Sequence, residues 1–246
     1  MTGIEEIRGR IVISKTYVLS FIFCVWATNA VAVEVLFFGA TRNTGLEAVK
    51  LLAEQGHAVT AFVRASSDVA ALTELDVRLV TGDALDFPSV ASAFEGTPYD
   101  VVISTLSGGI RNTSVDGQGN INVFEAAEGA GVERVILVTT IGAGGTESVL
   151  PESAQRFLKP VIDAKTIAEN DLRTRELTWT ILRPGQLPEG AATGNGLLTE
   201  DQSTMGIITM GELAALIVQC VSDDATYNKI FHTVDSDMTG SVPSFE

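Results

Sequence analysis

Gly39-Ala-Thr-Arg-Asn-Thr-Gly45 is the stretch that decides the fold, because it joins a strand to a helix. Before it, residues 33–38 are short, β-branched and aromatic, as in a buried strand. After it, apolar residues recur through 46–55 at helical spacing. A glycine turn that leads a strand into a helix points free N–H groups and the positive end of the helix dipole at one place. The sequence context is therefore the one that dinucleotide binding requires.

From residue 33 onward, predicted strands and helices alternate with short connections, which is typical of βαβ units around a parallel sheet. A loop over 189–195 is expected to be mobile. The pattern predicts an α/β fold, a doubly wound Rossmann sheet with a short C-terminal substrate region, in one domain over 33–246. The expected strands are 33–38, 58–63, 77–80, 100–104, 134–140, 179–182 and 229–233. The expected helices are 46–55, 67–75, 88–94, 119–128, 160–175 and 211–221.

Polar residues and glycines follow the carboxyl ends of the predicted strands. In open α/β sheets, ligands bind at those ends, near the point where the strand order reverses. The sequence therefore predicts a nucleotide cleft along this edge of the sheet. The strand ends are Gly39, Arg64, Gly82-Asp83, Ser104-Thr105, Thr140 and Arg183-Pro184.

Composition limits the partners of the chain. Its net charge of −15 argues against a nucleic-acid partner, because no basic stripe is present to replace counterions. Two cysteines, Cys24 and Cys220, do not indicate a disulfide framework, and two histidines do not indicate a metal site. The expected partner is a small molecule.

Residues 1–32 differ from the rest of the chain. Arg8, Arg10 and Lys15 precede an uncharged apolar run, and Ala30-Val-Ala32 has the small residues that a signal peptidase cleaves after, the layout of a secretory signal. The run from Tyr17 is short for a bilayer span, which needs about 20 residues. An exported domain, an uncleaved membrane anchor and a start-site artefact all fit this segment. Location therefore stays open between cytoplasmic and exported or membrane-anchored, with membrane contact only through this segment.

The chain resembles the atypical short-chain dehydrogenase/reductase superfamily, specifically its NmrA-like and flavin-reductase-like members, over roughly residues 33 to 235. This resemblance implies an NAD(P)-binding Rossmann fold. It rests on Gly39-Ala-Thr-Arg-Asn-Thr-Gly45, Phe62-Val-Arg64, Gly82-Asp83, Asp163-Ala-Lys-Thr-Ile-Ala-Glu169 and Trp179-Thr-Ile-Leu-Arg-Pro-Gly185.

Site residues follow from the resemblance position by position. The glycine turn would hold the pyrophosphate, Asp83 would lie near the adenine, and Lys165 matches the lysine that holds the nicotinamide ribose. Thr140 would stand in for the hydrogen-bonding Ser/Thr, so that Thr140 and Lys165 are the catalytic candidates. The expected cofactor-binding residues are Gly39, Thr41, Arg42, Asn43, Thr44, Gly45, Arg64, Asp83, Ser104, Thr105, Leu106, Thr140, Lys165 and Arg183.

Two arginines favour NADP(H) over NAD(H). Arg42 stands where many members of the superfamily have glycine, and Arg64 follows the second strand. Both can bind a ribose 2′-phosphate, whereas an NAD-specific site places Asp or Glu at the end of that strand.

One departure from the superfamily concerns its catalytic tyrosine, which belongs four residues before Lys165, where this chain has Val161. Valine cannot act as a general acid, so ordinary ketone reduction and sugar-nucleotide epimerisation are disfavoured. Two functions fit: an NADPH-dependent reductase of a flavin, quinone or similar acceptor, and a non-catalytic NADP(H)-sensing regulator or assembly module.

Overall fold

The computed structural model describes residues 32–237, so the predicted N-terminal extension lies outside the described residues, apart from Ala32. The first strand begins almost at once, at Glu34. Within the described part, no helix combines the length and apolar character that a bilayer span demands.

Eight strands form one sheet in the order β3-β2-β1-β4-β5-β6-β8-β7. Neighbouring strands are parallel except for β7, which pairs with β8 in the antiparallel direction. The predicted doubly wound parallel sheet is therefore confirmed, with one antiparallel strand added at its edge. The strands are β1 (Glu34–Phe38), β2 (Ala58–Val63), β3 (Val77–Thr81), β4 (Val101–Ser104), β5 (Arg134–Val138), β6 (Thr178–Pro184), β7 (Gly196–Thr199) and β8 (Lys229–Asp235).

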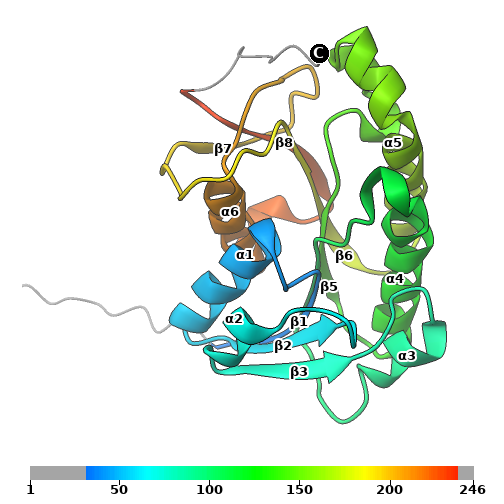
Figure 1. Cartoon of the computed structure of the whole chain (residues 1–246), viewed down its shortest axis with the longest axis vertical. Coiled ribbons are helices and arrows are strands. Elements are labelled where there is room, and N and C mark those ends of the chain that lie inside the picture. The colour runs from blue at the N-terminus through cyan, green and yellow to red at the C-terminus, as the bar shows by residue number, and fades with distance from the viewer. Residues whose placement is uncertain (1–31, 238–246) are drawn as a thin grey trace, which may run out of the picture. The chain divides into compact units, whose positions relative to one another are not determined.

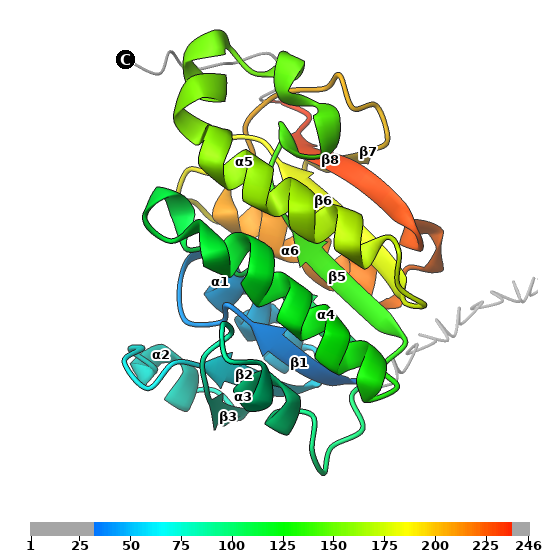
Figure 2. The same cartoon turned by 90° about the vertical axis from the view of Figure 1, so that its right-hand side faces the viewer.

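Helices cover both faces of the sheet. α1, α2 and α6 supply buried side chains to the core on one face, and α3, α4 and α5 supply them on the other. Figures 1 and 2 show the two layers, with α4 and α5 running side by side across their face. The helices are α1 (Asn43–Glu54), α2 (Ala70–Thr73), α3 (Phe87–Ser92), α4 (Asn120–Gly129), α5 (Glu152–Leu172) and α6 (Met210–Ser222).

Burial on both faces explains the composition of the central strands. All five residues of β5 are buried, and the four residues of β4 are buried as well. Such strands are near-continuous apolar runs, as expected where helices cover both faces of a parallel sheet. The strand order reverses at β1, because β2 lies on one side of it and β4 on the other. This switch point places the ends of β1 and β4 beside each other.

Three elements differ from the sequence prediction. α5 begins at Glu152 rather than at residue 160, so exposed Pro160 lies inside the helix and not in its first turn as the sequence suggested. Strand β7 was not predicted, since four residues at a sheet edge carry little periodic signal. The loop expected to be mobile at 189–195 is anchored, because Glu212 accepts hydrogen bonds from the backbone N–H groups of Thr193 and Gly194 at 2.6 and 2.7 Å.

Candidate functional site

A cleft of about 380 Å³ opens at the switch point between β1 and β4. It brings together eleven of the fourteen residues expected to bind the cofactor. Those on its wall are Gly39, Thr41, Arg42, Asn43, Thr44, Gly45, Arg64, Asp83, Thr105, Leu106 and Lys165.

The turn after β1 needs glycine at both ends. Gly39 has φ +91°, and a Cβ there would lie 2.5 Å from Thr105 Oγ1. A Cβ on Gly45 would collide with the carbonyl oxygen of Gly39. Thr105 Oγ1 in turn lies 3.2 Å from that carbonyl oxygen and donates to it. The end of β4 therefore packs directly on the turn, and only bare backbone fits between them.

Helix α1 begins at Asn43 with its first amides unused by side chains. Arg42 occupies the N-cap position and makes no side-chain cap, and the first turn carries no acidic residue. Asn43 has φ 52°, a left-handed conformation that asparagine tolerates. Free N–H groups and the positive end of the helix dipole therefore face the cleft with no carboxylate to compensate them. This is the chemistry that a pyrophosphate requires.

The end of the cleft beside β2 and β3 carries positive charge. Arg42 and Arg64 are exposed, line the cleft, and have no acidic partner among the described residues. Ser67 joins them on the wall. Asp83, after β3, is oriented by its own loop, since its Oδ1 accepts from the N–H of Leu85 at 2.9 Å.

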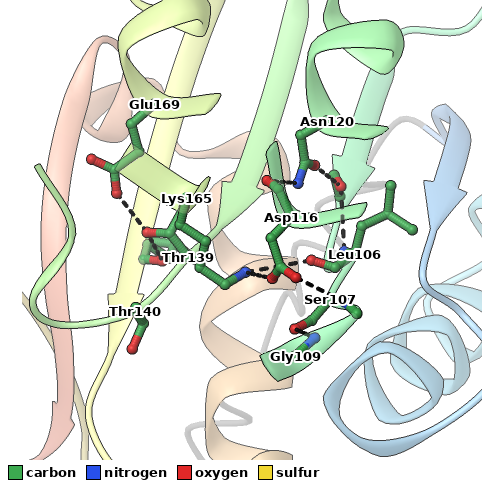
Figure 3. A network of polar contacts seen from close by, with 12 residues as sticks. Leu106, Ser107, Gly109, Asp116, Asn120, Thr139, Thr140, Lys165 and Glu169 are labelled. Carbon is green, nitrogen blue, oxygen red and sulfur yellow. Dashed lines mark hydrogen bonds and ion pairs between the residues drawn. The ribbon is translucent and has the colours of Figure 1, made fainter. Parts of the chain in front are cut away.

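Lys165 lies at the other end of the cleft. Its side chain is 7% exposed, and its ammonium lies 3.0 Å from Oδ1 of Asp116, which is fully buried. The same ammonium donates to the carbonyl oxygen of Leu106 at 3.4 Å. Figure 3 shows Lys165 reaching from α5 to this carboxylate. Lys165 is not paired with Glu169, one turn further along α5, which instead binds Arg183.

Asp116 is held in place from several sides. It lies in a single π-helical turn, Val115–Gly119, that leads into α4. Its Oδ2 accepts from the N–H of Gly108 at 2.9 Å, and its backbone carbonyl accepts from Asn120 at 2.9 Å. Asn120 in turn accepts from the hydroxyl of Ser104 at 2.6 Å. The polar chain in Figure 3 thus links the end of β4 to Lys165.

Three expected site residues do not lie on the cleft wall. Ser104 is fully buried and is used by Asn120. The hydroxyl of Thr140 donates to the carbonyl oxygen of Ile141 at 3.2 Å, and Figure 3 shows it apart from Lys165. Arg183 is 1% exposed and donates to both carboxylate oxygens of Glu169, at 3.0 and 2.5 Å. Its guanidinium therefore forms a buried ion pair and does not face the cleft.

Thr139, one residue earlier than expected, takes the place on the wall that the sequence assigned to Thr140. Its hydroxyl donates to Oε1 of Glu169 at 2.7 Å, which connects the cleft to the Arg183 ion pair. This hydroxyl is thus used within the protein, and so it offers an oxygen acceptor rather than a free proton.

Sequence reasoning missed several wall or supporting residues. Asp116 carried a signal, because Asp-Gly-Gln-Gly before a helix is an unusual combination of a carboxylate with two glycines. Thr139 carried none, since nothing in two adjacent threonines says which one faces the cleft. Leu187 also lines the cleft but lies in a segment without periodic pattern, and Met210 lines it one residue before the helix predicted over 211–221.

Comparisons with known proteins agree with this geometry. Residues 39–224 match the model of a family described as NAD(P)H-binding. An uncharacterized sugar epimerase, YhfK, of Bacillus subtilis is 29% identical over 211 residues, which cover 83% of this chain and 95% of that protein. The photosystem II assembly factor Ycf39 of Synechocystis is 22% identical over 218 residues, covering 84% of this chain and 64% of that protein.

A solved structure is also similar. ChuY, described as an anaerobillin reductase from Escherichia coli O157:H7, is 31% identical and superposes with a TM-score of 0.77. The match covers 86% of this chain and all of the other. The resemblance that the five sequence motifs suggested is confirmed, and the chain belongs to the NAD(P)H-binding family of atypical short-chain dehydrogenases/reductases.

Proposed function

We propose that this chain is an NADPH-dependent reductase that passes hydride to a flavin, a quinone or a similar electron-poor ring. The observation that carries the proposal is the content of the cleft: a phosphate-binding turn and Lys165 line it, while the position of the superfamily's tyrosine is Val161, 8% exposed. Binding groups are present, and the usual proton donor is replaced by an aliphatic side chain.

The residues present fit the cofactor. The turn from Gly39 to Gly45, with a glycine at each end, would hold the pyrophosphate, and Lys165 would hold the nicotinamide ribose. When bound, the reduced nicotinamide supplies a hydride, which is two electrons and one proton. Asp116 orients the ammonium of Lys165, and the apolar side chains of Leu187 and Met210 also line the cleft.

The lack of a proton donor at the tyrosine position limits which acceptors this chain could reduce. A conjugated ring takes hydride by proximity and orientation, and it takes its second proton from water, so the reduced ring gains two electrons and two protons in all. A ketone oxygen would need a donor held beside it, and neither Val161 nor the committed hydroxyl of Thr139 supplies one. The likeness to a reductase, ChuY, supports the same class of reaction.

NADPH preference is tested by Arg64→Ala. Arg64 lines the cleft and has no acidic partner in the described part of the chain, so its loss should raise the Kd for NADPH about tenfold, as expected for one charge-assisted contact. The Kd for NADH should stay unchanged, because NADH lacks the 2′-phosphate. Isothermal calorimetry on the full-length chain measures both. Arg173→Ala, which removes an exposed arginine at the end of α5, is the matched control. Equal losses for both nucleotides would refute the preference.

A non-catalytic NADP(H)-binding regulator or assembly module is the second candidate. Val161 favours it, as does the likeness to a photosystem II assembly factor. The two are separated by mixing the full-length chain with NADPH and flavin mononucleotide (FMN), then with a panel of quinones, and following NADPH absorbance. Turnover supports the reductase; tight NADPH binding without turnover on any acceptor supports the regulator.

A further inference from the structure

Two of the positive side chains that make no ion pair within residues 32–237 line the cleft, and a third adjoins a residue of the cleft wall in the sequence. Residues 32–237 contain thirteen Lys and Arg side chains, and eight of them form ion pairs. A ninth, Arg134, is buried and donates to Thr180 and to neighbouring oxygens. The four that remain without such partners are Arg42, Arg64, Arg111 and Arg173. Acidic residues outnumber basic ones by 31 to 16, so a shortage of carboxylates does not explain why these arginines lack a partner.

Arg42 and Arg64 belong to the cofactor end of the cleft, whereas Arg111 lies elsewhere. It ends a short 3-10 turn, Gly109–Arg111, between Gly108 and Asn112, which both line the cleft. This turn packs against α5, the helix that carries Lys165. In Figure 3, Gly109 lies close to the Asp116–Lys165 pair. The turn that carries Arg111 therefore lies beside the Lys165 end of the cleft, where the proposed acceptor would enter, and Arg111 itself is exposed next to the cleft wall in sequence.

The turn that carries Arg111 is well fixed. The N–H of Gly108 donates to Asp116, and the N–H of Gly109 donates to the hydroxyl oxygen of Ser107 at 3.3 Å. The N–H of Asn112 closes the turn on the carbonyl oxygen of Gly109 at 3.3 Å. A platform ordered before binding loses less entropy when it takes a ligand.

We propose that the acceptor carries an anionic group, a phosphate or a carboxylate, and that Arg111 binds it. This inference rests on the proposed reductase function and names the class of its substrate. The guanidinium fork matches two oxygens of either anion, and Asn112 and Ser107, which line the cleft, offer further donors. In a chain of net charge −15, an anionic ring is repelled at long range, so one unpaired arginine at the entrance decides how well it binds.

Two flavins that share one ring system test the proposal. FMN carries a phosphate and riboflavin does not. With the full-length chain and saturating NADPH, the KM should be about tenfold lower for FMN than for riboflavin. Arg111→Ala should raise the KM for FMN about tenfold and leave the KM for riboflavin and for NADPH unchanged. Arg173→Ala removes another exposed arginine that makes no ion pair within residues 32–237 and should change none of them.

A second pair distinguishes the two anions: carboxymethylflavin and its methyl ester. A preference for the free acid that Arg111→Ala abolishes indicates carboxylate recognition, and the FMN pair reports on phosphate. Equal KM values within both pairs, or equal effects of Arg111→Ala and Arg173→Ala, would overturn the proposal.

The proposed function can fail separately. If none of the flavins supports NADPH oxidation, calorimetry of FMN binding to the chain saturated with NADP⁺ still tests the anion site. Weaker FMN binding in Arg111→Ala alone supports the anion site, whereas no FMN binding to the wild type overturns it.

Discussion

At the scale of single residues, Lys165 and Asp116 form the least replaceable contact in the cleft. The pair is buried, so removing one partner leaves the other charge uncompensated. Asp116→Asn keeps an oxygen that can accept from Gly108 but removes the charge. We expect the Kd for NADPH to rise about tenfold, which corresponds to about 1.4 kcal/mol, because the ammonium is no longer aimed at the ribose. Fluorescence titration with NADPH measures the change.

A double-mutant cycle shows whether Asp116 acts through the lysine. In a Lys165→Met background, Asp116→Asn should change the Kd less than about twofold. The same loss in both backgrounds would mean that Asp116 supports the fold and does not position Lys165. Asp163→Asn, which breaks an exposed ion pair with Lys159 on the same helix, is the control and should leave NADPH binding unchanged.

The role of a residue could be predicted from the sequence where the local backbone geometry allows only one residue type. Gly39 and Gly45 could be read from the sequence, because a strand, a tight turn and a helix leave no room for a side chain there. Arg183 could not, since a strand-end arginine looks the same whether it faces the cleft or a carboxylate. Its partner, Glu169, comes from a helix 14 residues earlier, and only the packing of α5 on the sheet brings the two together.

At the scale of elements, the first turn of α6 holds the loop before β7. Glu212 is 4% exposed and accepts from the N–H groups of Thr193, Gly194 and Gly196 at 2.6, 2.7 and 2.8 Å. Thr209, the N-cap of α6, also donates to the carbonyl oxygen of Ala191 at 2.8 Å. Since Met210 begins α6 and lines the cleft, this anchor also fixes one part of the cleft wall.

Glu212→Gln should loosen that loop. The amide group points two donors at backbone N–H groups that need acceptors, so about 1–3 kcal/mol of local stability should be lost. Hydrogen exchange at residues 193–196 should accelerate by roughly tenfold or more, while β1 and β4 keep their protection. Glu189→Gln, an exposed change in the same loop, should alter neither. Unchanged exchange in Glu212→Gln would show that the carboxylate does not anchor the loop.

Thr193→Val provides a second measurement if Glu212→Gln fails to fold. Its hydroxyl donates to Asp235 at 2.5 Å, so its loss should loosen the loop to a smaller extent.

At the scale of the whole molecule, the sequence predicted the layers better than the edges. The central strands and their helices were evident from periodicity, because burial on both faces of β4 and β5 demands apolar runs. The edge at β7 and the early start of α5 were not, since both depend on contacts between distant segments. The cleft followed from the switch point, whereas the side chains that line its Lys165 end depend on how α5 packs against the π-helical turn.

The pH dependence of stability depends on His232, which is buried in β8 where that strand joins β6 to β7. Its Nδ1 lies 2.8 Å from the carbonyl oxygen of Thr204 and donates to it, and its Nε2 has no partner among the described residues. A second proton would sit on that unpartnered, buried nitrogen. Burial accordingly lowers the pKa of His232 below its ordinary value of 6.5.

The sign of the effect follows from proton linkage. Below pH 6.5 the unfolded chain binds a proton that the native His232 refuses, so stability falls as the pH drops through 6.5 towards the native pKa. Urea unfolding at about pH 7.5, 6.5 and 5.5 should therefore show a smaller loss in His232→Gln than in the wild type. Burial also lowers the pKa of His57, which is only partly buried, so His57→Gln is the matched comparison and should flatten the profile less. Parallel profiles for the wild type and His232→Gln would exclude His232 as a source of the acid sensitivity.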